Sequence, residues 1–171
     1  MLRPTALAAV ALILGAPGTA LAEAPLGAIS GTLGGVERIW HTRLDRPGGR
    51  PGSTAVERFA LLHAASLEGF PADDGGDRLG VLSIRLSIAP AGDHVLAARV
   101  LYYPHSYGAF YLSPPDPGGV EVSLARDATL GKIAGRLTTT LCWQADPLSL
   151  RDESRCRELD IRFESELPLA E

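Results

Sequence analysis

Residues 156–167 read CRELDIRFESEL, and apolar side chains alternate here with charged ones. In an extended chain, successive side chains point to opposite faces, so this period of two separates an apolar face from a charged face. The apolar face is formed by Leu159, Ile161, Phe163 and Leu167. The pattern predicts a strand with one buried face and one solvated face, which is typical of antiparallel sheets.

The same alternation recurs upstream, between stretches rich in glycine and proline that have the composition of turns. We predict about nine short strands, over residues 26–33, 36–42, 64–69, 79–88, 94–103, 107–112, 119–125, 131–142 and 156–167. Many short strands separated by turns predict a mainly β fold, which is either an antiparallel β-sandwich or a barrel-like sheet. Residues 23–171 are expected to form one such domain.

One segment carries conflicting signals. Thr54 and Glu57 have the spacing of a helix capping box, and Gly69 is suited to the end of a helix. The alanines and leucines between them predict a short helix over residues 55–68. The sequence HAASLEG (63–69) is equally compatible with a strand, because tertiary contacts often override local helix propensity.

The first 22 residues have the organisation of a secretory signal peptide. Arg3 gives a basic start, residues 5–14 form an apolar stretch, and Ala20-Leu21-Ala22 fits the small-x-small rule for cleavage. The apolar stretch is too short to cross a bilayer core, which needs about 20 residues. We therefore expect cleavage after Ala22, export to the periplasm or the cell exterior, and no membrane span in the mature chain.

The chain is mildly acidic, with 16 basic residues, 20 acidic residues and a formal net charge of −4. Proteins that bind nucleic acids or anionic membrane surfaces usually present basic patches. The charge balance therefore argues against nucleic acid and against an anionic membrane surface as partners, and it favours a soluble protein.

The two cysteines, Cys142 and Cys156, lie fourteen positions apart. A redox pair would have Cys-x-x-Cys spacing, and a zinc site would need further Cys or His ligands. The nearest histidine is His105. Two cysteines in an oxidising compartment favour a structural disulfide, so we predict a bond between Cys142 and Cys156.

Strand parity places both cysteines on the outer face of a hairpin formed by the last two predicted strands. Pairing them defines three further cross-strand pairs, which are Gly135 with Phe163, Lys132 with Glu166 and Arg136 with Arg162. The first pair places an aromatic ring over a glycine, and the second predicts an ion pair. The third pair juxtaposes like charges, which is unfavourable.

The sequence contains no nucleophile elbow, metalloprotease helix, phosphate loop or dinucleotide fingerprint. Its four histidines, at positions 41, 63, 94 and 105, are scattered and lack metal-ligand spacing. We therefore expect no cofactor. A hydrolase remains as an alternative only if its site is assembled from separated residues, such as His105 with Asp73 or Asp77.

The sequence PADDGGDR (71–78) places Asp73, Asp74 and Asp77 in one glycine-rich loop. Carboxylate oxygens on such a loop are ligands that calcium accepts, which makes the three residues a weak metal candidate. Aspartate and glycine are also the usual residues of turns, and the EF-hand pattern is absent. A turn is therefore favoured over a calcium site.

The sequence YYPHSYGAFYLSPP (102–115) holds all four tyrosines of the chain, Tyr102, Tyr103, Tyr107 and Tyr111. Exposed tyrosines offer stacking area and a hydroxyl group, which suits carbohydrates, other small molecules or a partner protein. Aromatic residues also favour strands and fill cores. We predict that part of this set forms a binding surface.

These observations lead to three hypotheses about function. The first is an exported, non-enzymatic β-domain that binds a ligand or a partner through the tyrosine-rich stretch. The second is a structural or assembly component of the cell envelope, which would accept a partner's strand at an exposed sheet edge. The third is the hydrolase with dispersed catalytic residues.

Overall fold

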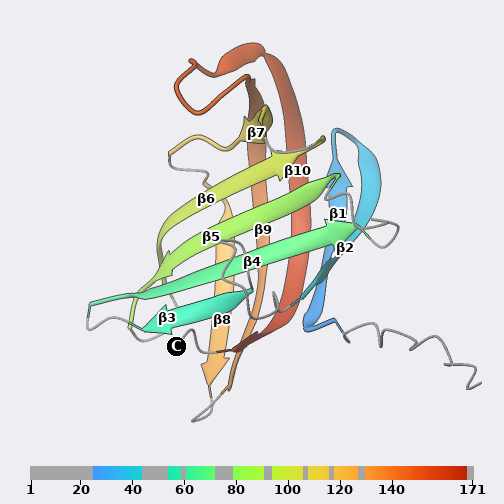
Figure 1. Ribbon diagram of the computed structural model, residues 1–171. Coiled ribbons are helices and arrows are strands. Elements are labelled where there is room, and N and C mark those ends of the chain that lie inside the picture. Colours follow the sequence, from blue (N-terminus) through green and yellow to red (C-terminus); the bar gives the residue numbers. More distant parts are fainter. Residues whose placement is uncertain are drawn as a thin grey trace, which may run out of the picture.

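A computed structural model (Figure 1) describes residues 25–43, 54–58, 61–71, 79–90, 94–105, 108–115, 118–126 and 130–168. Within these ranges the chain forms ten β-strands and no helix. The strands are β1 (Gly27–Leu33), β2 (Val36–Thr42), β3 (Ala55–Arg58), β4 (His63–Pro71), β5 (Val81–Ile88), β6 (Val95–Tyr103), β7 (Phe110–Leu112), β8 (Val120–Arg126), β9 (Leu130–Gln144) and β10 (Asp152–Pro168).

All the strands belong to one antiparallel sheet that curls until its two ends meet. Hydrogen-bonded neighbours follow the order β10-β1-β2-β4-β5-β6-β7-β9, and β9 pairs in turn with β10. β8 pairs with β9, and β3 pairs with β4. In Figure 1, β4, β5 and β6 cross in front of the long strands β9 and β10. The predicted mainly β, antiparallel fold is confirmed, with a barrel-like closure of the sheet.

The segment with conflicting signals forms strands, and the alternative prediction of a helix over residues 55–68 is wrong. β3 pairs with β4, and the side chains of Val56, Ala65 and Leu67 are buried in the core. The hydroxyl of Thr54 accepts a hydrogen bond from the backbone N–H of Glu68 at 3.1 Å instead of capping a helix. Cross-strand pairing and burial therefore override the local helix propensity.

The core lies inside the curled sheet and is built from the inward faces of its strands. The alternating residues of β10 that were predicted to be buried are all buried, at 3% exposure or less. Ser165 also points inward, and its hydroxyl lies 2.8 Å from that of Thr42, so the two buried hydroxyls satisfy each other. The indole N–H of Trp40 donates to the carbonyl oxygen of Gly80 at 2.8 Å.

The pairing of β9 with β10 has the predicted register. Cys142 lies opposite Cys156, and Gly135 lies opposite Phe163. A Cβ atom added to Gly135 would lie 2.5 Å from Cζ of Phe163 and would also meet the carbonyl oxygen of Glu121. Glycine is therefore required at position 135 for the ring of Phe163 to enter the core.

The charged pairs on the outer face differ from the prediction. Lys132 lies opposite Glu166 but forms no ion pair with it, since exposed lysines gain little from such contacts. Arg136 lies opposite Arg162 and turns away from it toward Asp160. Its Nε donates to Oδ1 of Asp160 at 3.2 Å and its Nη2 donates to Oδ2 at 2.9 Å. The unfavourable contact is thereby replaced by a bidentate ion pair.

Several sequence predictions fall on residues outside the described ranges, which are the signal peptide (1–22), Asp73, Asp74, Asp77 and Tyr107. They stay predictions. The described part of the chain contains no helix long and apolar enough to cross a membrane.

The close approach of Gly135 and Phe163 predicts the effect of a single methyl group. Gly135→Ala should lower the free energy of unfolding by about 1–3 kcal/mol, because the new Cβ overlaps the ring and a backbone oxygen. Urea unfolding followed by circular dichroism would measure this change. The cost of Gly135→Ala should be smaller when it is measured in a Phe163→Leu background than in the wild type, because the smaller leucine leaves room for the new methyl group. An unchanged unfolding midpoint for Gly135→Ala would contradict the packing.

The contact between Arg136 and Asp160 predicts a pH dependence. The hydrogen bond from Arg136, assisted by its charge, lowers the pKa of Asp160 below the ordinary value of 3.8. A carboxyl group whose pKa is lowered on folding stabilises the fold above pH 3.8, and this contribution is lost as the pH falls through the lowered pKa. Arg136→Gln should raise the pKa of Asp160 in an NMR titration of its carboxyl carbon. Identical titration curves in the two proteins would contradict the assignment.

The disulfide between Cys142 and Cys156 predicts a measurable loss when it is removed. The double variant Cys142→Ala with Cys156→Ala should be about 3 kcal/mol less stable, since the unfolded chain gains the freedom of an open loop. Urea unfolding of this variant and of the reduced wild type would measure the effect. Mass spectrometry of the protein purified from its native source without reductant should give a mass two hydrogens below that of the reduced form. Two free thiols in that protein would refute the bond.

Candidate functional site

β10 continues past the point where its pairing with β1 ends, while β7 pairs with β9 as far as Gln144. β1 pairs with β10 from Leu159 to Ser165, whereas β9 pairs with β10 as far as Asp152. In Figure 1 this part of the hairpin projects from the end of the curled sheet. The disulfide between Cys142 and Cys156 ties the two strands at its base. We call residues 142–157 the clasped hairpin.

The turn at the end of the clasped hairpin is held by its own hydrogen bonds. Oδ1 of Asp146 accepts from the backbone N–H of Leu148 at 2.8 Å and of Ser149 at 3.0 Å. The hydroxyl of Ser149 donates back to the carbonyl oxygen of Asp146 at 2.9 Å. The side-chain amide of Gln144 donates to the carbonyl oxygen of Ser149, also at 2.9 Å. Aspartate and serine thus fix the turn by the side-chain bonding that is usual for these residues.

This fixed turn presents two leucines to solvent. Leu148 is 96% exposed and Leu150 is 94% exposed. Single exposed apolar residues are common on protein surfaces and need no explanation. Leu148 and Leu150 are the two most exposed large apolar residues in the described ranges, and both lie on a turn that is held by side-chain hydrogen bonds and closed off by a disulfide. Such a surface is suited to docking, since little conformational entropy is lost when it binds.

Aromatic rings and arginines form a stack below the turn. The rings of Tyr111 and Trp143 meet edge to face, with centroids 5.1 Å apart. The guanidinium of Arg155 lies 4.5 Å from the ring centroid of Trp143, and that of Arg157 lies 4.8 Å from the ring centroid of Tyr111. These distances are those of cation–π contacts. The stack fixes both arginine side chains while leaving the residues exposed.

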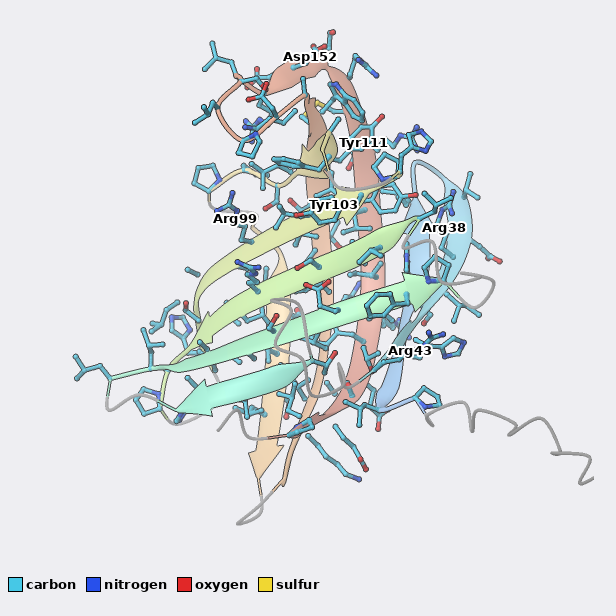
Figure 2. The ribbon with its side chains drawn as sticks, in the orientation of Figure 1. Arg38, Arg43, Arg99, Tyr103, Tyr111 and Asp152 are labelled. Atoms are coloured by element: carbon cyan, nitrogen blue, oxygen red, sulfur yellow. A yellow bond between two sulfur atoms is a disulfide. The ribbon has the colours of Figure 1, made fainter. Side chains whose placement is uncertain are left out.

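Two of the four tyrosines in the predicted binding surface are buried in this arrangement. Tyr102 and Tyr111 lie opposite each other in adjacent strands and are 3% and 6% exposed, so both belong to the core. Tyr103, on the other face of β6, is half-buried, and its ring centroid lies 5.8 Å from that of Phe110. Figure 2 shows Tyr103 and Tyr111 below the part of the hairpin that carries Asp152. Tyr102 and Tyr111 therefore support the clasped hairpin from inside and do not form a binding surface themselves.

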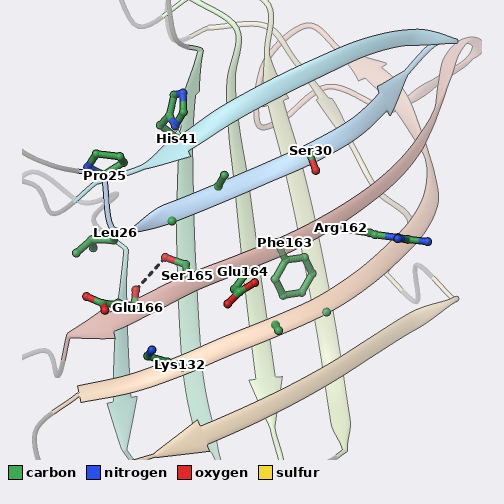
Figure 3. Close-up of a pocket in the computed structure, with 14 residues that line it drawn as sticks. Pro25, Leu26, Ser30, His41, Lys132, Arg162, Phe163, Glu164, Ser165 and Glu166 are labelled. Atoms are coloured by element: carbon green, nitrogen blue, oxygen red, sulfur yellow. Dashed lines mark hydrogen bonds between the residues drawn. The ribbon is translucent and has the colours of Figure 1, made fainter.

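A groove of about 720 Å³ runs over the outer faces of β1, β9 and β10 (Figure 3). β1 and β9 contribute glycine and alanine to its lining, and these small residues leave the space of the groove open. Its charged lining residues are Lys132, Arg162, Glu164 and Glu166, with His41 at the side of β2. Figure 3 shows these groups spread along the groove instead of converging on one point. The groove therefore lacks the convergent polar groups that orient a small ligand.

The structure brings no catalytic or metal-binding set together among the residues it describes. Within the described ranges, no three His, Cys, Asp or Glu residues lie close enough together to hold a metal ion. His63 is buried, and its Nε2 lies 3.3 Å from the carbonyl oxygen of Pro90. His94 and His105 are exposed, and His41 lines the groove. The carboxylates that were paired with His105 in the hydrolase hypothesis, Asp73 and Asp77, lie outside the described ranges.

The sequence reasoning identified the disulfide but missed the leucines and arginines around it. Leu148 and Leu150 occur in DPLSLRD (146–152), which has the composition of a turn and lies between two strands. Apolar residues in a turn between two strands could have indicated a binding surface, because their side chains cannot reach the core from there. Arg155 and Arg157 have the same parity as the buried Leu159, which alone predicts nothing about their contacts. Their stacking on aromatic rings could be inferred only once β7 was known to lie beside β9.

Comparison of the chain with protein-family models, with curated proteins and with solved structures finds no match. No relative therefore supplies a fold family, an activity or a set of functional residues. The geometry of the clasped hairpin is what remains for inferring function, and it has the properties of a preorganised docking element.

Proposed function

We propose that this protein is an exported binding module that docks onto a partner protein through the clasped hairpin. The observation that carries the proposal is the exposure of Leu148 and Leu150 on a turn with fixed geometry. The partner is expected to offer an apolar pocket that buries both leucines. Burying a leucine side chain fully contributes about 1.5–3 kcal/mol, so two of them would provide an anchor for such a contact.

The composition around the turn supports the same proposal. Tryptophan, tyrosine and arginine are the residues most enriched among those that dominate binding energy at protein interfaces. Trp143, Arg155 and Arg157 lie at the base of the hairpin that carries the leucines. Because the stack and the disulfide fix this region before binding, the ordering cost on association is low.

Export to the periplasm or the cell exterior is part of the proposal. Its support is the N-terminal segment, which has the pattern of a signal peptide, and the disulfide, which is compatible with an oxidising compartment. The proposed role needs no cofactor and assigns no catalytic residue.

Site-specific photo-cross-linking tests the docking surface. A photoreactive residue at position 148 should give a discrete cross-linked product in an extract of the exported proteins. Adding Leu150→Ser to the same chain should reduce the yield of this product at least about tenfold, because the second leucine no longer fills the partner's pocket. The matched control places the photoreactive residue at position 61. Leu61 is 83% exposed and lies between β3 and β4, away from the hairpin.

Two results would count against the proposal. The same product from position 61, or a yield that does not respond to Leu150→Ser, would show that the leucines are not the anchor. A product of twice the mass of the chain would identify a second copy as the occupant, and it would overturn a distinct partner protein.

A further inference from the structure

Arg155 and Arg157 form no ion pair within the described residues, and Arg155 is only weakly attracted by the carboxylate of Asp152. Both residues are exposed and stack on aromatic rings, and the side chain of Arg157 also lies beside Gly34. Neither forms a hydrogen bond or an ion pair with any residue in the described ranges. A guanidinium that stacks through its planar face keeps its N–H groups directed sideways, where they can bind an anion in bidentate fashion.

The carboxylates nearest along the strand are already engaged elsewhere. Glu153 pairs with Arg151 at 3.2 Å. Oδ1 of Asp152 accepts from the N–H of Ser154 at 3.0 Å and from its hydroxyl at 2.6 Å. These bonds lower the pKa of Asp152, and the attraction of Arg155 makes the smallest contribution. Glu158 points to the opposite face, where it accepts from the hydroxyl of Thr140 at 3.3 Å.

The spacing of the two arginines restricts the ligand. They lie two positions apart on β10, next to an irregularity in its pairing with β9, and both stack on the same pair of aromatic rings. In an extended strand this spacing separates the two Cα atoms by about 6.8 Å. An extended peptide with acidic residues at alternate positions presents two carboxylates on one side at the same separation. One carboxylate would then face each guanidinium, with the peptide running alongside β10.

We propose that Arg155 and Arg157 bind an acidic segment of the partner protein, in extended conformation, with carboxylates at alternate positions. This inference rests on the proposed function and names the chemistry of the partner. An acidic segment is favoured over an anionic membrane because the chain has a net charge of −4, which opposes approach to an extended anionic surface. Two local guanidiniums suffice for two carboxylates.

The test uses the mature protein, with residues 142–157 intact, and a synthetic hexapeptide of alternating glutamate and threonine. Binding is followed by the NMR signals of the arginine Nε–H groups and of the Trp143 indole N–H. The peptide should shift the signals of Arg155 and Arg157, and Arg155→Gln or Arg157→Gln should each weaken binding about tenfold. Arg155→Lys should weaken it several-fold, because lysine keeps the charge but loses the stacked fork.

The chain offers a matched control in Arg85 and Arg99. These two exposed arginines lie directly opposite each other in β5 and β6, and no described aromatic ring stacks on them. The variant Arg85→Gln with Arg99→Gln should bind the peptide within about twofold of the wild type, since its lost charges lie outside the stack. Equal weakening in this control would overturn the inference, because charge alone would then explain binding.

Two other probes complete the test. A hexapeptide with glutamine in place of glutamate should leave the signals unchanged. Inorganic phosphate that shifts them at a lower concentration than the acidic peptide would overturn a carboxylate segment as the ligand. The variant Leu148→Ser with Leu150→Ser should bind the acidic peptide as the wild type does. If it does so while cross-linking from position 148 fails, the docking proposal fails and the arginine site stands. If cross-linking from position 148 succeeds but the acidic peptide shifts the signals of neither Arg155 nor Arg157, the arginine site fails and the docking proposal stands.

Discussion

The pairing of β9 with β10 is the constraint on which the rest of the structure depends. These are the two longest strands, and their ladder closes the ring of paired strands that runs from β10 through β1 and β7 to β9. A slip of one residue would turn Leu159, Ile161 and Phe163 toward solvent, so the buried face strongly favours one register. Gly135 reinforces the same register, because its missing side chain provides the space for Phe163. The disulfide fixes it at the far end.

Once this register is set, the outer face must accommodate the charges that it brings together. Arg136 and Arg162 meet because Phe163 needs Gly135, and the like-charge contact is relieved by rotating Arg136 toward Asp160. The exposed ion pair contributes little to stability by itself. The ion pair draws Arg136 away from Arg162 and so reduces the repulsion between them. The buried face therefore determines the register, and the surface side chains adjust to it.

Local pattern explains why most strands could be predicted from the sequence. Alternation marks a half-buried strand directly, and the two cysteines gave the register of one hairpin. The segment from Thr54 to Gly69 shows where local reasoning ends, since its helix signals are overridden by pairing with β5. The burial of Tyr102 and Tyr111 likewise depends on β6 lying beside β7, a contact that their own sequence does not encode. Loop residues such as Leu148 have no period to interpret at all.

The position of the candidate site follows from the length of the hairpin relative to the closed sheet. Along one face of β10, Leu159, Ile161 and Phe163 enter the core, whereas Arg155 and Arg157 lie beyond the end of β1. Beyond the end of β1, a side chain on this face of β10 does not enter the core, so core packing does not require it to be apolar. The arginines are held instead by the rings that close the end of the core. The hairpin can therefore vary for binding while the sheet below it keeps its register.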